Sequence, residues 1–173
     1  MVYTTKKKLF GLGILIVLII GLMVPQHLDN PVDKADKGSY NPKSFWYYPW
    51  GKYGTHKGVD IFAKESTRVN SSTGGLVLFK GEIERGGKVV VILGPKWRLH
   101  YYAHLQNIET GLLSWTSKGE RIGTVGTTGN AKGKPPHLHY SIMTLIPYPW
   151  RADAAKQGWK KMFYLDPISY LSR

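Results

Sequence analysis

Two kinds of hydrophobic pattern occur along the chain. Residues 9–24 form one uncharged, mostly apolar run that directly follows three lysines, residues 6–8. From residue 44 onward, apolar, β-branched and aromatic residues instead come in short runs separated by turn residues, which is typical of strands. The clearest of these runs occupy residues 75–83, 88–94, 97–105 and 137–145. Gly86 and Gly87 predict a hairpin turn between the first two runs. The pattern favours an all-β antiparallel domain, either a sandwich or an open barrel.

The apolar run at residues 9–24 predicts export. It is longer than the core of most signal peptides and slightly shorter than the roughly 20 residues of a membrane-spanning helix. The preceding lysines indicate that the N-terminus stays in the cytoplasm while the rest crosses the membrane. Because no small-x-small cleavage motif follows, we expect residues 1–25 to form an uncleaved transmembrane signal anchor, with cleavage and secretion as the alternative. In both cases the C-terminal domain would lie on the periplasmic or wall side.

Composition sets the domain boundaries. Residues 26–43 are polar and contain Pro, Asp, Gly and Asn, as linkers do. We therefore expect the folded domain to comprise residues 44–173. It opens with an aromatic stretch, SFWYYPWGKYGTH at residues 44–56. Packing against the first strand is the simpler interpretation of these aromatic residues, and lining of a substrate groove is the alternative.

Composition and charge narrow the possible chemistry. The chain has no cysteine, which excludes a disulfide scaffold, a thiolate zinc site and a cysteine nucleophile. Any metal ion must therefore be bound by His, Asp or Glu. The formal net charge of +13 favours anionic partners such as nucleic acid, acidic lipid or an acidic wall polymer, or serves only solubility. Because the export segment argues against nucleic acid, we expect no nucleic-acid partner.

Five of the six histidines fall within the predicted β domain. Side chains two residues apart on a strand share a face. This spacing places His137 beside His139, and it predicts one shared face for His100, Tyr102 and His104. An extended chain would also bring His56, which opens HKGVD, to the same face as Asp60, which ends this motif. Three segments can thus direct imidazole or carboxylate groups to a common point.

Such a cluster has the composition of a catalytic zinc site. Catalytic zinc takes three protein ligands and keeps one position open for water, and neighbouring groups move protons and stabilise charge. A single HxH or HxxxD pattern often occurs by chance. The combination within one small domain is much less common. The residues that match this requirement in type and number are His56, Asp60, His104, His137 and His139.

The order of four motifs identifies a family resemblance. HKGVD, YYAHL, GERIGTVGTTGN and PPHLHY follow one another as in the lysostaphin-type (LytM-like) zinc metallopeptidases of the bacterial cell wall. The resemblance covers about residues 45–171 and includes the terminal LDPISYL. It implies an exported zinc metalloendopeptidase that hydrolyses peptide cross-links of peptidoglycan through a zinc-activated water.

The resemblance also implies a role for each site residue. His56, Asp60 and His139 would bind one zinc ion. His104 and His137 would be catalytic: they would take the proton of the water, stabilise the oxyanion and protonate the leaving amine, with the division of these roles left open.

Some positions depart from the family pattern. Lys132 and Lys134 lie in the loop before HLH, and they either bind acidic substrate groups or are only solvated. The glutamate that usually follows HLHF and the arginine of FG-x-R are absent. His100 is an additional histidine, placed either beside the site or at its rim. These departures bear on the choice of substrate more than on the metal.

Two other interpretations remain. The domain could be a non-catalytic wall-binding module that regulates other cell-wall hydrolases, although all five site positions are filled. The zinc could also be purely structural, which predicts a closed shell of four ligands and no free histidine pair.

Overall fold

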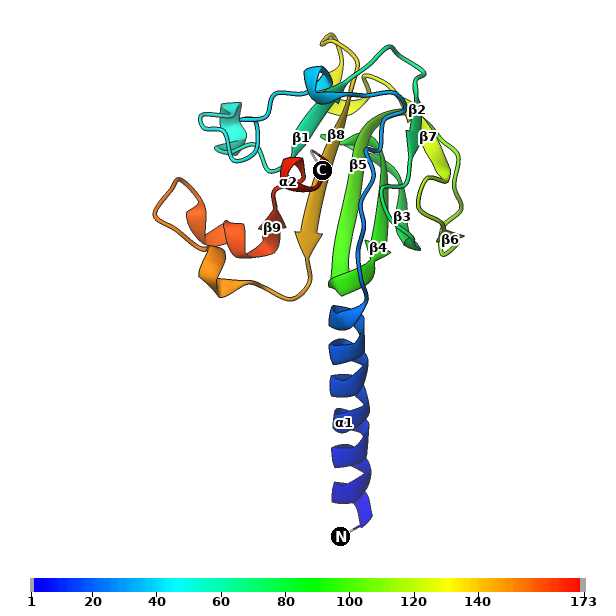
Figure 1. The fold of residues 1–173 in the computed structure, drawn as a ribbon, viewed down its shortest axis with the longest axis vertical. Coiled ribbons are helices and arrows are strands. Elements are labelled where there is room, and N and C mark those ends of the chain that lie inside the picture. The colour runs from blue at the N-terminus through cyan, green and yellow to red at the C-terminus, as the bar shows by residue number, and fades with distance from the viewer. Residues whose placement is uncertain (1, 172–173) are drawn as a thin grey trace.

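The computed structural model describes residues 2–171 and contains an N-terminal helix followed by an antiparallel β domain (Figure 1). The helices are α1 (Val2–Met23) and α2 (Ile168–Leu171). The strands are β1 (Val59–Phe62), β2 (Arg68–Asn70), β3 (Gly75–Ile83), β4 (Gly87–Gly94), β5 (Arg98–Ile108), β6 (Trp115–Thr116), β7 (Arg121–Val125), β8 (His137–Thr144) and β9 (Tyr164–Leu165). The short 3-10 helices are η1 (Lys37–Ser39), η2 (Gly51–Tyr53), η3 (Pro95–Trp97), η4 (Gly129–Ala131), η5 (Pro149–Arg151) and η6 (Gly158–Phe163).

The strands form one antiparallel sheet that is not closed into a barrel. The main path runs in the order β1-β8-β5-β4-β3-β6, while β2 pairs with β7, and β9 pairs with β8. The first part of β5 pairs with β8 and β4, and its last part pairs with β7, so this long strand joins the two parts of the sheet. The predicted all-β antiparallel architecture is confirmed. The predicted turn at Gly86 and Gly87 is confirmed as the β3–β4 hairpin.

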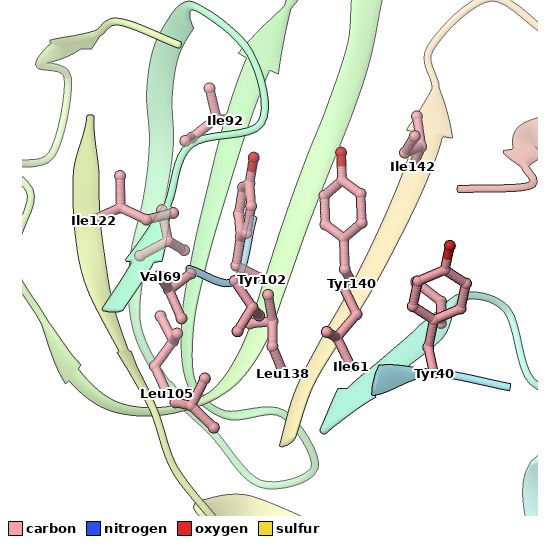
Figure 2. Packing of buried hydrophobic residues seen from close by; sticks show 14 of the residues in the cluster. Tyr40, Ile61, Val69, Ile92, Tyr102, Leu105, Ile122, Leu138, Tyr140 and Ile142 are labelled. Atoms are coloured by element: carbon pink, nitrogen blue, oxygen red, sulfur yellow. The ribbon is translucent and has the colours of Figure 1, made fainter. Parts of the chain in front are cut away.

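Alternation along β8 separates the hydrophobic core from the opposite face of the sheet. Leu138, Tyr140 and Ile142 point into the core, where Tyr140 lies beside Tyr102 of β5 (Figure 2). The two rings lie 5.1 Å apart between centroids. The hydroxyl of Tyr102 accepts a hydrogen bond from the backbone N–H of Ser72, so its polar end is satisfied inside the core. The residues of β8 that alternate with Leu138, Tyr140 and Ile142 therefore point to the other face of the sheet.

Helix α1 projects from the base of the β domain (Figure 1). At its C-terminal end, the indole Nε1 of Trp97 donates a hydrogen bond to the carbonyl of Leu18. Among the described residues, no helix combines the length and apolar character needed to cross a membrane. The predicted transmembrane anchor, and with it membrane contact through α1, is therefore not supported. The uncharged run, residues 9–24, is shorter than a typical span, and lysines occupy the turns before it.

The segment that was expected to form a linker packs against the domain. Asn70 N–H donates to the carbonyl of Pro31, and Asp33 N–H donates to the carbonyl of Arg68. Between these two bonds, Val32 forms a β-bridge with Val69. Its side chain is 1% exposed and belongs to the hydrophobic core. The chain before β1 thus extends the side of the sheet formed by β2 and β7.

Replacement of Val32 by alanine tests this packing. Because the side chain is buried in the core, Val32→Ala should lower the free energy of unfolding of the full chain by about 2 kcal/mol. Denaturant titration measures the change. Val24→Ala is the matched control, because the Val24 side chain is 40% exposed and its removal should cost less than about 0.5 kcal/mol. Equal stability of the two variants would show that the Val32 side chain does not contribute to the stability of the domain.

Candidate metal centre

Three of the residues singled out in the sequence meet at one point on the face of the sheet opposite the core. Asp60 of β1 lies directly across from His139 of β8 in the antiparallel register, and His56 lies just before β1. The Asp60 Oδ1 atom is 2.7 Å from His139 Nδ1 and 3.1 Å from His56 Nε2. The two imidazole nitrogens are also 3.1 Å apart. Each residue therefore offers one ligand atom within the reach of a single ion.

In His56 and His139, one ring nitrogen donates a hydrogen bond, and this fixes the other ring nitrogen as the one that can bind a metal. His56 Nδ1 donates to the backbone carbonyl of Ser44 at 3.0 Å, which leaves the Nε2 lone pair free. His139 Nε2 donates to Ser141 Oγ at 3.0 Å, which leaves its Nδ1 lone pair free. Ser141 Oγ in turn donates to the carbonyl of Lys57. Three acceptor atoms then face one another, and only protons or a cation can stabilise them at these distances.

The donor set fits zinc. Two imidazole nitrogens and one carboxylate oxygen match the ligands that zinc takes in catalytic sites. Asp60 also has the charge that such a site requires. Burial raises the pKa of its carboxyl group, but hydrogen bonds from His139 and His56, when protons occupy the nitrogens that face it, outweigh burial and hold this pKa well below its usual value. A bound cation would take the place of those protons. Asp60 is therefore an anion at neutral pH.

His104 and His137 lie side by side next to these three residues. Their ring centroids are 5.0 Å apart, and the His104 ring is 6.1 Å from that of His139. His104 Nδ1 donates to the carbonyl of Thr128, and His137 Nδ1 donates to the carbonyl of Pro135. Each ring thus keeps Nε2 as a proton acceptor. Burial, followed by the nearby charges of His139 and His137, lowers the pKa of His104 to about 4, so this imidazole is neutral at pH 7.

A β-bulge, rather than simple alternation, brings His104 to this face. On β5, Tyr102 lies opposite Val90 and Leu105 lies opposite Lys88. Between these two pairs, β5 has two residues, 103 and 104, where β4 has one. His104 itself has a φ of 64°. The bulge turns its side chain away from the core face on which Tyr102 lies. The prediction that His100, Tyr102 and His104 share one face is therefore wrong, because it assumed a regular strand.

His100 lies on the core face, away from the metal centre. It is fully buried, and its Nδ1 donates to the hydroxyl of Tyr140 at 2.7 Å. Its Nε2 accepts a hydrogen bond from the side-chain amide of Gln26. Burial, followed by the positive charge of Arg98, lowers the pKa of His100 to about 3. His100 is therefore a neutral core residue, neither beside the site nor at its rim.

The site opens into a cavity of about 270 Å³. Trp50 lines this cavity and stacks on the His56 ring, with centroids 4.2 Å apart. Lys134 also lines the cavity, whereas Phe45 packs against the hydrophobic core. Within the aromatic stretch at residues 44–56, one part thus packs against the core and another part lines the cavity, so packing and groove lining both occur.

Ser44 and Ser141 were not recognised from the sequence. Ser44 contributes a backbone carbonyl, which every residue has, so no sequence signal could reveal it. Ser141 did carry a signal, because it lies two residues after His139 on the same face of β8 and occupies the position of the missing glutamate.

Removal of the Ser141 hydroxyl tests its role in orienting His139. Ser141→Ala should weaken zinc binding by about 10- to 100-fold, as is typical when a group that orients a metal ligand is lost. Competition with a chromogenic chelator measures the affinity. Ser117→Ala, at an exposed serine, is the control and should bind zinc as the unchanged chain does. Equal affinity in both variants would show that Ser141 does not orient the ligand.

Comparison with solved structures places this fold. The catalytic domain of lysostaphin from Staphylococcus simulans superposes with a TM-score of 0.61 at 24% identity, over 75% of this chain and 90% of that chain. A zinc containing peptidase from Vibrio cholerae superposes with a TM-score of 0.56 at 26% identity, over 68% of this chain and 36% of that chain.

Sequence relatives and a family model agree with this fold. The L-Ala--D-Glu endopeptidase of Bacillus subtilis is 36% identical over 112 residues, which are 60% of this chain and 34% of that protein. The peptidoglycan DD-endopeptidase ShyA of Vibrio cholerae is 34% identical over 88 residues, which are 51% of this chain and 20% of that protein. The match thus spans about a third or less of these relatives. Residues 54–151 match the model of Peptidase family M23, and the chain belongs to that family.

Proposed function

We propose that the chain is an exported zinc metalloendopeptidase that hydrolyses peptide cross-links of bacterial peptidoglycan. The observation that carries the proposal is the juxtaposition of the three ligand atoms of His56, Asp60 and His139 with a second pair of imidazoles beside an open cavity. Membership of a peptidase family and the endopeptidase activities named for the relatives support the same chemistry.

The two histidines outside the ligand set have the groups that amide hydrolysis needs. A zinc ion held by the three ligands would lower the pKa of water to about 7 and polarise the scissile carbonyl. The rings of His104 and His137 line the cavity beside these ligands. A neutral imidazole there accepts a proton from the attacking water. Once protonated, it can stabilise the oxyanion and donate a proton to the leaving amine.

The geometry disfavours the other two interpretations. A structural zinc site would close a shell of four ligands, but within the described residues the cluster supplies three ligand atoms and faces a cavity. A regulatory module that had lost catalysis would not need the His104–His137 pair. Here both rings are held by hydrogen bonds from Nδ1 to backbone carbonyls, an arrangement that presents Nε2 to a substrate.

Export is part of the proposal because the substrate lies outside the cytoplasm. The lysines at residues 6–8 followed by the apolar run of α1 have the order of an export signal. The positive net charge of +13 also suits an anionic wall.

Digestion of purified peptidoglycan by the full chain tests the proposal. Asp60→Ala should lose both zinc and hydrolysis, because it removes the anionic ligand. His137→Ala should keep zinc but lose about 10²- to 10⁴-fold in kcat, as expected for removal of a general acid–base. Release of soluble peptides measures hydrolysis, and metal analysis of the washed protein measures zinc.

Two controls make the outcome decisive. A chelator should abolish hydrolysis and added zinc should restore it. His27→Ala, at an exposed histidine remote in sequence from the site motifs, should have full activity. Hydrolysis that survives both the chelator and His137→Ala would reject the proposed zinc-dependent mechanism. Zinc binding by an unchanged chain that releases no peptide would favour the regulatory module.

A further inference from the structure

The cavity beside the metal centre is lined by an excess of positive charge. Lys57, Arg85 and Lys134 line it together with the metal-site and catalytic residues. Among the described residues of this lining, the one acidic side chain is Asp60, and its carboxylate is turned toward His56 and His139. Among the described residues, the lining therefore holds three cationic side chains and one carboxylate.

Arg85 is held in place by the backbone of the catalytic region. It belongs to the turn between β3 and β4, and its carbonyl accepts a hydrogen bond from the N–H of Asn130 at 3.0 Å. The next carbonyl, that of Gly86, accepts a hydrogen bond from the N–H of His104 at 2.8 Å. The backbone that carries Arg85 is thus bonded directly to the backbone that carries His104. The backbone from which the exposed Arg85 side chain extends is therefore fixed beside the cavity.

Lys134 is fixed in a similar way on the opposite loop. Its N–H donates to the carbonyl of Ala131 at 3.0 Å, which closes a turn after η4. Two prolines follow it, and the carbonyl of Pro135 accepts the hydrogen bond from His137 Nδ1. Proline restricts the backbone, so the spacing between Lys134 and His137 is limited to few conformations. The backbone positions of Arg85 and Lys134 are therefore set relative to the two catalytic imidazoles.

We propose that Arg85 and Lys134 bind carboxylate groups of the substrate, so that the groove selects an anionic stem peptide over a neutral glycine bridge. The inference rests on the proposed function and specifies its substrate class. A guanidinium group can bind a carboxylate through two parallel hydrogen bonds, and a lysine ammonium adds a point charge. Stem peptides of peptidoglycan carry free carboxylates close to their peptide bonds, whereas oligoglycine bridges carry none.

Equilibrium binding separates this inference from catalysis. The probes are the stem peptide L-Ala–γ-D-Glu–diaminopimelate–D-Ala–D-Ala and the same peptide with its glutamate, diaminopimelate and C-terminal carboxylates all converted to carboxamides. The full chain is loaded with zinc and carries His137→Ala, so that the peptides are not consumed. Calorimetry measures the affinity of each peptide before and after the further change Arg85→Gln/Lys134→Gln. Lys37→Gln/Lys80→Gln removes the same charge at positions outside the cavity lining and is the control.

The carboxylate peptide should bind roughly three- to thirtyfold more weakly after loss of Arg85 and Lys134, because two exposed ion pairs are lost. The carboxamide peptide should bind equally well with and without these two cations, and the control pair should affect neither peptide. High salt should reduce the difference, as screening weakens exposed charge pairs. Because zinc remains in every variant, its own attraction for carboxylates cancels in this comparison.

Other results would overturn the inference. If loss of the two cations changed both peptides equally, or neither, then Arg85 and Lys134 would not bind substrate carboxylates. Hydrolysis of the stem peptide by the unchanged zinc-loaded chain, measured in parallel, reports on the proposed function alone. Selective binding without hydrolysis would support the inference and reject the proposed function. Hydrolysis without selective binding would support the proposed function and reject the inference.

Discussion

The register between β1 and β8 determines whether this chain can hold a metal ion. Asp60 pairs with His139, and on either side of Asp60 the buried residues Val59 and Ile61 pair with core residues of β8. A slip of one residue would move these two apolar side chains out of the core and carry the Asp60 carboxylate into it. Burial of the hydrophobic face therefore fixes the position of the ligands on the opposite face. The same strands form the core and the metal centre, so neither can change register alone.

Most of the candidate site residues were accessible from the sequence because their placement depends on local spacing, whereas the choice of ligands among them came from the family resemblance. Histidines two residues apart share a face on any regular strand, and β8 is regular from His137 to His139. The face predicted to be shared by His100, Tyr102 and His104 was wrong because the position of His104 depends on a bulge. The extra residue in β5 is a property of pairing with β4 and β7, and the letters YYAHL do not reveal where that pairing shifts. The strands themselves followed from their composition, whereas their order in the sheet did not.

The chain before the domain shows why composition alone misleads. Residues 26–43 are polar, but isolated apolar residues among them, such as Val32 and Tyr40, are buried in the core. Three buried residues in eighteen produce no periodic signal. Backbone hydrogen bonds to β2, which any sequence can form, supply the rest of the attachment. Gln26 likewise reaches the side chains of Arg98 and His100, and such long-range polar contacts have no local signature.

The partner of His139 affects the charge of the whole centre. A carboxylate that accepts the second N–H of a metal-binding histidine adds negative charge and makes the imidazole a stronger base. Here Ser141 provides a neutral hydroxyl at that position, so Asp60 is the anion among these contacts. A divalent cation bound to Asp60 and two neutral imidazoles leaves a net positive charge. That charge adds to the charges of the cations that line the cavity rather than being cancelled within the site. Under the proposed function, a negatively charged substrate would therefore gain on approach, and the neutral serine would contribute to this preference without touching the substrate.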